Sequence, residues 1–134
     1  LRWEWEVQVP ELDTSDFIVP GRYVKNAEDR LIVLNRTAAS VVEAQRGKHA
    51  SHVFAYQKQP ITRMLNSAWL RARKAAELTQ VRVHDLKHTF GQRLRAAGVS
   101  FEDRQDLLGH RSGPITTHCS AAERFKLLEA ASRG

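Results

Sequence analysis

The sequence predicts one α+β domain, mostly helical, with a small sheet of three strands near its N-terminus. Two patterns predict this fold class. Polar and apolar residues alternate in short runs in the first part of the chain, whereas apolar residues recur at helical spacing in the rest. The chain has 134 residues, of which 42% are hydrophobic, and this suffices for a single core without an internal domain boundary.

Three short runs carry the predicted strands. Residues 1–9 alternate strictly between apolar and polar side chains, as a half-buried strand does, and Pro10 ends the pattern. An acidic loop follows, and residues 17–19 are the second run. Residues 30–34 are the third, after a turn rich in polar residues. The tryptophans of the first run fit core positions and need no functional role.

Two helices are expected in the middle of the chain. Thr37 is predicted to cap a short helix that turns Val41 and Val42 inward. Pro60 and Thr62 are predicted to start a longer helix. One face of this longer helix is apolar and consists of Leu65, Ala68, Trp69, Ala72 and Ala76.

Residues 81–109 predict a pair of helices joined by a tight turn. The apolar face of the first helix consists of Leu86, Phe90, Leu94 and Ala97. Gly98 follows the last of these residues and is expected to cap the helix at its C-terminus. Ser100 is expected to open the second helix, with Asp103 three residues later as a variant of the capping box, and Gly109 is expected to end it.

The charge of the chain favours a polyanionic partner. The formal net charge is +6. Residues 61–100 alone carry eight basic and two acidic side chains. The basic face of the longer helix consists of Arg63, Arg71, Arg73 and Lys74. Such a face is either simply solvated or contacts nucleic-acid phosphates, and both interpretations stay open.

Cysteine content and hydropathy bear on the compartment. A single cysteine excludes an internal disulfide and fits a reducing cytoplasm. No apolar run reaches the length of a membrane span, so we expect no membrane partner. The chain starts at Leu1 without Met, inside a predicted strand, and we expect it to be a fragment or an excised domain.

Three polar clusters occur at the predicted helix ends, where side chains can converge on one point. They are residues 84–88 (HDLKH), residues 108–110 (LGH) and residues 117–119 (THC). We predict that His84, Lys87, His110 and Cys119 form one basic pocket.

The clusters and their spacing resemble the catalytic domain of the tyrosine recombinases, most closely the phage-integrase branch. That family has a His-x-x-Arg box at a helix start, then a Leu-Gly-His box, then a nucleophilic tyrosine nine positions later. Here His84-x-x-Lys87 corresponds to the first box and Leu108-Gly109-His110 to the second, and Cys119 lies nine positions after His110. The resemblance spans nearly the whole chain and implies that the N-terminal strands form an antiparallel sheet.

The resemblance implies a reaction and a role for each residue. The family breaks and rejoins DNA by phosphoryl transfer without metal or cofactor. His84 and His110 would donate to the phosphate, and Lys87 would supply the positive charge of the box arginine. Lys25, on the turn before the last strand, would be the general acid, and Cys119 would occupy the nucleophile position. The implied partner is double-stranded DNA rather than a small molecule, in the cytoplasm of a bacterium, as a phage-encoded or nucleoid-associated protein.

The sequence departs from the family pattern at three places, and two of them, Cys119 and the missing upstream arginine, predict that this chain does not cut DNA, whereas lysine at position 87 can be tolerated. Lysine at position 87 is a point charge where arginine is a bidentate fork. The sulfur of Cys119 is attached to Cβ and cannot reach as far as a tyrosine oxygen. The family's first catalytic arginine lies upstream of the strand that opens this sequence, so we expect residues 1–134 to lack the N-terminal part of the domain.

Other roles remain open. The chain could be a non-catalytic DNA-binding remnant of a recombinase. It could also be an oligomerisation module, because the family's C-terminal helix often docks on a neighbouring protomer. Phe125, Leu128 and Ala131 share one side of the predicted last helix and could serve that docking. His88 is expected to be structural. Zinc bound by His84, His88, His118 and Cys119 is disfavoured, because a metal would occupy the phosphate pocket.

Overall fold

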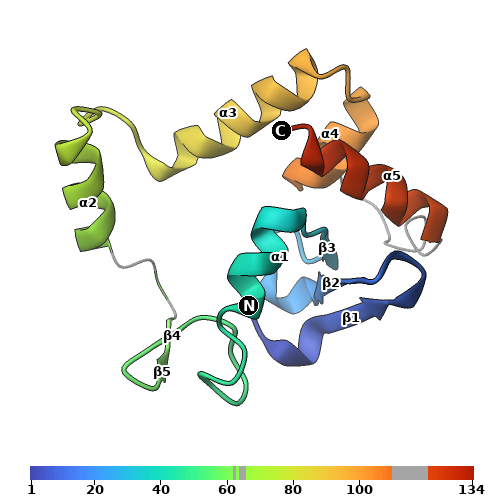
Figure 1. Ribbon diagram of the computed structural model, residues 1–134, viewed down its shortest axis with the longest axis horizontal. Coiled ribbons are helices and arrows are strands. Elements are labelled where there is room, and N and C mark those ends of the chain that lie inside the picture. The colour runs from blue at the N-terminus through green and yellow to red at the C-terminus, as the bar shows by residue number, and fades with distance from the viewer. Residues whose placement is uncertain (62, 64–65, 110–120) are drawn as a thin grey trace.

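The computed structural model describes residues 1–61, 63, 66–109 and 121–134. Its fold is α+β and mostly helical with a small N-terminal antiparallel sheet, which confirms the predicted class. The sheet, α1 and α5 lie together, and α2 lies apart from them at the other end of α3 (Figure 1). In the described part of the chain, no helix is both long and apolar enough to cross a membrane.

The sheet consists of β1 (Glu6–Val9), β2 (Thr14–Val19) and β3 (Arg30–Ile32) in that order, all antiparallel. Two short 3-10 helices, η1 (Trp3–Trp5) and η2 (Pro10–Leu12), precede β1 and β2, and a third, η3 (Gly21–Tyr23), follows β2. The strand predicted from residue 1 therefore starts only at Glu6. The reason is tertiary: the Trp3 N–H donates to the Ser51 carbonyl at 3.1 Å, so the first residues pair with residues 51–53 instead of extending β1.

The main core lies between the sheet and α1 (Arg36–Glu43). Its buried residues are Phe17, Leu34, Val42 and Val53, with both N-terminal tryptophans packed against them. The helix is capped by Asn35 rather than by the predicted Thr37, since the Asn35 side chain accepts the Ala38 N–H at 2.9 Å. Val41, predicted to face inward, is 48% exposed.

The middle of the chain forms a hairpin and a short helix. β4 (Ala55–Tyr56) pairs with β5 (Gln59–Pro60), so Pro60 belongs to a strand and does not start the next helix. α2 (Asn66–Ala75) starts later than predicted and contains no buried residue. Of its predicted apolar face, Ala68 and Ala72 are exposed and Trp69 is only half-buried, whereas Leu65 lies outside the described residues.

α3 (Val83–Ala96) and α4 (Phe101–Leu108) form the predicted helix pair. Gly98 adopts φ +74°, and the Val99 N–H donates to the Leu94 carbonyl at 3.0 Å, which completes a Schellman motif. Ser100 caps α4 as predicted by accepting the Asp103 N–H at 3.1 Å. Leu94 and Val99 then join Ala130 in a second core cluster.

α5 (Ala121–Ser132) packs against its own chain through one face. The buried residues of that face are Arg124, Leu127, Ala130 and Ala131. Polar contacts fix the helix at both ends: Arg124 Nη1 lies 3.8 Å from Asp16 Oδ2, and the Asn35 side-chain amide donates to the Ala131 carbonyl at 3.1 Å. Phe125 lies away from this face and is 51% exposed.

Candidate functional site

The first predicted box occupies the first turn of α3. Asp85, at the third helical position, accepts the Arg82 backbone N–H at 2.8 Å and pairs with the Arg82 guanidinium at 3.0 Å. The hydrogen bond from the Arg82 side chain is the largest cause of the lowered pKa of the Asp85 carboxyl. Asp85 therefore has a local structural role, because it fixes the turn from which the box side chains project.

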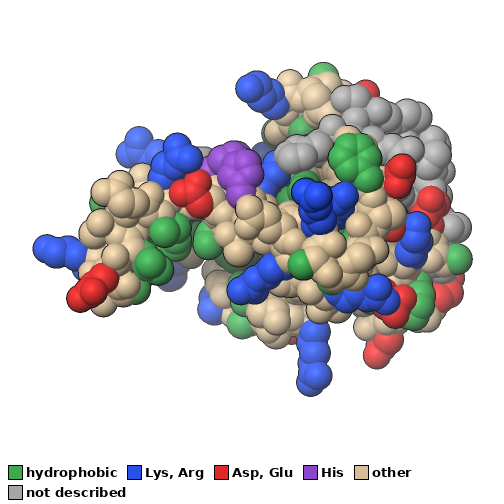
Figure 2. Space-filling model, turned by 90° about the horizontal axis from the view of Figure 1, so that it is seen from above, with side chains coloured by type: hydrophobic (Ala, Val, Ile, Leu, Met, Phe, Trp, Pro, Cys, Tyr) green, Lys and Arg blue, Asp and Glu red, His purple; other side chains and the backbone are tan. Residues whose placement is uncertain are grey.

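His84 and His88 are exposed on the first turns of α3, and Lys87 is half-buried. The two imidazole rings meet edge to face with centroids 4.8 Å apart. Lys87 makes no hydrogen bond or ion pair with another residue in the described part of the chain, so its ammonium is available there. Histidine side chains lie on the same face of the molecule as many lysine and arginine side chains (Figure 2). The start of α3 therefore presents cationic groups and hydrogen-bond donors to a ligand.

Leu108 and Gly109 of the second box lie at the end of α4, which packs against α3. Gly109 ends α4 in the left-handed conformation, at φ 61° and ψ 41°. The Leu108 side chain reaches α3 at Gly91: a Cβ built on Gly91 would lie 3.1 Å from Leu108 Cδ1. Positions 84, 87 and 91 recur at helical spacing, so both box residues share the face of α3 that Leu108 contacts. The packing thus brings the two boxes onto adjacent helices.

Arg30, in β3, is a residue at this site that the sequence analysis did not single out. Its Nη2 donates to the Leu108 carbonyl at 3.4 Å, a long hydrogen bond. Its guanidinium also lies directly against Gly109, where a Cβ would overlap it. No motif spacing identifies this residue, because the contact joins positions that are 78 residues apart. The only sequence signal is a basic residue at the start of an apolar strand.

Lys25 lies on the connection between η3 and β3 and is exposed, on the predicted turn. The connection is closed by a hydrogen bond of 2.8 Å from the Gly21 N–H to the Asp29 carboxylate. Among the described residues, Lys25 makes no hydrogen bond or ion pair. The structure therefore leaves its ammonium free and does not join it directly to His84 or Lys87.

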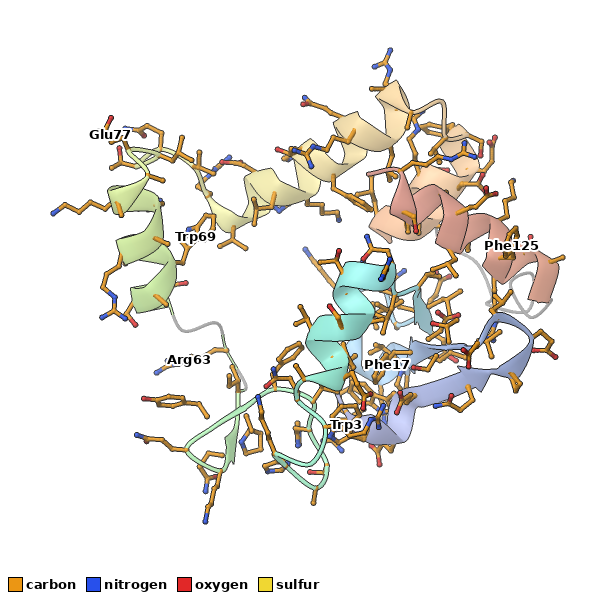
Figure 3. The ribbon with its side chains drawn as sticks, in the orientation of Figure 1. Trp3, Phe17, Arg63, Trp69, Glu77 and Phe125 are labelled. Atoms are coloured by element: carbon orange, nitrogen blue, oxygen red, sulfur yellow. The ribbon has the colours of Figure 1, made fainter. Side chains whose placement is uncertain are left out.

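The predicted DNA-binding residues lie in and before α2. Arg63, Arg71 and Lys74 are exposed, whereas Arg73 is half-buried and donates to the Val81 carbonyl at 3.0 Å. Figure 3 shows Trp69 on the side of α2 toward the rest of the domain, and Arg63 beside the connection that enters α2. Three of the four side chains are thus available to a polyanion, and Arg73 also fixes the turn between α2 and α3.

Two predicted site residues, His110 and Cys119, lie outside the described residues, as do Thr117 and His118. The predicted convergence of both with His84 and Lys87 therefore stays a prediction. Among the described residues, no group of three or more possible ligand side chains could hold a metal ion.

Comparison with known proteins shows the family of this chain. Residues 5–123 match the model of the phage integrase family. The integrase of Salmonella phage P22 is 35% identical over 94 residues, which cover 60% of this chain and 24% of that protein. The chain thus spans about a quarter of the length of this relative. No solved structure matches the chain. Because the family match covers most of the chain, including the start of α3 and the end of α4, the protein belongs to the phage integrase family.

Proposed function

We propose that this chain comes from the catalytic domain of a site-specific recombinase for double-stranded DNA, in a bacterium or its phage, and that the chain is inactive as it stands. The observation that carries the proposal is the contact between Leu108 and Gly91, which supports a common site for the two boxes. The exposed His84 and the half-buried Lys87 supply donors and charge on the same face of α3. The relationship to a phage integrase supports DNA as the substrate.

The chemistry of the proposed reaction fits these side chains. A nucleophilic oxygen attacks a DNA phosphate, the bond from phosphorus to the 5′ oxygen breaks, and the leaving oxygen takes a proton. Negative charge on the non-bridging oxygens needs donors and cations, and we assign these to His84, Lys87 and His110. The leaving oxygen needs an acid, and we assign this role to Lys25. The covalent link keeps the phosphodiester energy for rejoining to another strand.

We infer that the chain binds DNA but does not cleave it, because Cys119 takes the nucleophile position. A thiolate on Cβ falls short of a phosphate that a tyrosine oxygen would reach across its ring. Thiolates also react best with carbonyl and disulfide centres rather than with phosphates. Cys119 therefore also favours the second candidate, a non-catalytic remnant that holds DNA ends.

The decisive experiment restores the nucleophile. Cys119→Tyr is tested in this chain and in the chain extended at its N-terminus by an integrase segment that supplies the family's first arginine, on a nicked duplex whose cleaved strand cannot religate. We expect a DNA adduct that survives denaturant and disappears with protease in the extended Cys119→Tyr protein, and none with Cys119. An extended Cys119→Tyr protein that binds its site tightly without forming the adduct would establish the non-catalytic remnant. An adduct through Cys119 would refute our inference of inactivity.

DNA binding itself is tested by its dependence on salt. Affinity falls as salt rises, and each phosphate contact steepens the slope of log affinity against log salt by about 0.9. The double variant Arg71→Gln and Lys74→Gln should therefore reduce the slope by about 2. The control is Arg133→Gln, which removes an exposed arginine that already pairs with Glu129. Equal slopes for the double variant and the unchanged chain would rule out α2 as a phosphate-binding face.

We further propose that the exposed side of α5 joins protomers on DNA. The supporting observation is that Phe125 is 51% exposed while the opposite face of α5 is buried in its own chain. Phe125→Ser should lower the number of protomers on a duplex in analytical ultracentrifugation without changing the affinity of one protomer. An unchanged stoichiometry would eliminate this role for Phe125.

A further inference from the structure

The connection that carries Lys25 is a closed loop attached to the end of α4. Within the loop, the Gly21 N–H donates to Asp29 at 2.8 Å, and the Ala27 N–H donates to the Val24 carbonyl at 3.0 Å. A Cβ on Gly21 would overlap the Ala27 carbonyl, so the two ends of the loop are in close contact. These bonds make residues 21–29 a compact unit rather than an open turn.

Arg30 follows this loop immediately and contacts the second box. Its backbone is fixed in the sheet, where it pairs with Val19, and its side chain is half-buried. Its guanidinium lies against Gly109 and donates to the Leu108 carbonyl. A cation is favoured at this place, because the last carbonyls of α4 form the negative end of the helix dipole.

We propose that Arg30 is a positioning residue that holds the Lys25 loop at a fixed place relative to the end of α4, at Leu108 and Gly109 of the second box. The inference deepens the proposed function and rests on it, because it assigns Arg30 the task of keeping the general acid in register with the phosphate-binding box. In this proposal Arg30 has no direct role toward the reacting atoms or the DNA. It acts through two neighbours, the loop that precedes it in sequence and the helix end that it contacts.

The geometry also explains the residue types. Glycine is needed at 109 twice over, for the left-handed conformation and for the space that the guanidinium occupies. Arginine is preferred to lysine at position 30, because its flat group can lie on the Gly109 backbone while one N–H points to a carbonyl. Arg22 belongs to the same loop but stacks on Tyr23, with its Cζ 5.1 Å from the ring centroid, and so provides a matched control.

The first test measures the position of the loop without DNA. Spin labels are placed at Lys25→Cys and at the exposed position Glu102→Cys of α4, with Cys119→Ser to remove the native thiol. Pulsed electron resonance should give one narrow distance distribution for this protein and for Arg22→Gln. Arg30→Gln should lose the narrow distribution. An unchanged distribution in Arg30→Gln would overturn the proposal, and Arg30→Lys is used in the same way if Arg30→Gln does not fold.

The second test asks whether the misplaced group is the acid. In the extended protein with Cys119→Tyr, Arg30→Gln should slow adduct formation about 10-fold to 100-fold, since general acids contribute at least that much. A substrate with a sulfur in place of the bridging 5′ oxygen needs no acid, because a thiolate leaves unprotonated. Arg30→Gln should therefore approach the parent rate on this substrate.

The two tests separate the possible failures. Equal slowing on the oxygen and sulfur substrates would mean that Arg30 has only a general structural role. If the extended protein with Cys119→Tyr and native Arg30 forms no adduct on either substrate, the proposed function fails. The distance measurement then still decides whether Arg30 holds the loop.

Discussion

Two regions of the molecule differ in how completely their apolar side chains are covered. In the body formed by the sheet, α1, α5 and the C-terminal half of α3, Phe17 and Leu94 are fully buried. In the arm formed by α2 and the start of α3, no α2 residue is buried, and Leu70 and Leu86 are 47% and 51% exposed. The body therefore supplies most of the folding free energy, because buried apolar area is its main source.

The arm instead carries much of the charge that we assign to DNA. It contains Arg71, Lys74 and Lys87, which have no acidic partner in the described residues, whereas several basic residues of the body pair with carboxylates, as Arg46 does with Glu6 at 2.9 Å. Unpaired cations on a weakly packed helix suit a surface whose ligand supplies the missing counter-charge. In this chain, therefore, the body supplies most of the stability, whereas the arm carries much of the charge that we assign to DNA contact.

The strongest test of this comparison removes the same side chain from each region. Leu94→Ala should lower the free energy of unfolding by about 2–5 kcal/mol, because it leaves a cavity in the second core cluster. Leu70→Ala should change it by less than about 0.5 kcal/mol, because Leu70 is already 47% exposed and leaves no buried cavity. Urea denaturation followed by circular dichroism measures both values. Similar losses for the two variants would mean that α2 is covered in solution.

A second test concerns the buried ion pair of the body. Arg124→Met leaves the carboxylate of Asp16, which is 2% exposed, without its cation, and should cost about 3 kcal/mol at neutral pH. The matched control is Arg133→Met, which removes an exposed ion pair between Glu129 of α5 and the residue that follows the helix, and should change stability by less than about 0.5 kcal/mol. Denaturation at neutral pH compares the two variants.

The same ion pair predicts a dependence on pH. Burial raises the pKa of Asp16, and Arg124 opposes this rise. A raised pKa means that the folded state binds the proton more tightly than the unfolded chain does. Stability should therefore fall as pH rises from about 4 through the folded pKa, and fall further in Arg124→Met. The cost of the substitution should shrink when Asp16 is protonated, and a cost that is equal at pH 3 and pH 7 would contradict this account.

Local patterns predicted the parts of the fold whose causes are local. Gly98 and Ser100 mark the turn between α3 and α4, because a left-handed C-cap and a hydroxyl N-cap act within a few residues. Local sequence does not decide the N-cap of α1, since Asn35 and Thr37 both suit that position and lie two residues apart. The alternation of the residues before Glu6 predicts a strand, but a backbone partner at Ser51 decides their structure.

The candidate site also has features with local causes, which the sequence predicts, and features with tertiary causes, which it does not. The positions of the boxes at helix ends could be predicted from periodicity and capping residues. The contact of Arg30 with Gly109 could not, because nothing in either local sequence specifies a partner 78 residues away. The periodicity of the apolar residues likewise predicts the helix α2. It does not predict whether another element covers the apolar face of α2, since that depends on the tertiary packing.

The smallest predicted effect lies at the end of the arm, where Glu77 adopts φ +58° (Figure 3 labels it). The Leu78 N–H donates to the Arg73 carbonyl at 2.8 Å, so Glu77 takes the position in a Schellman motif that glycine normally occupies. Glu77→Gly removes a left-handed penalty and should stabilise the end of α2 by about 1 kcal/mol or less. Glu77→Ala removes the same charge but keeps Cβ, so it should give no such gain. Because α2 has no buried residue, the gain should slow hydrogen exchange of α2 amides without raising the global unfolding midpoint. A raised midpoint would show instead that the arm unfolds together with the body, and the separation of the two regions would then be wrong.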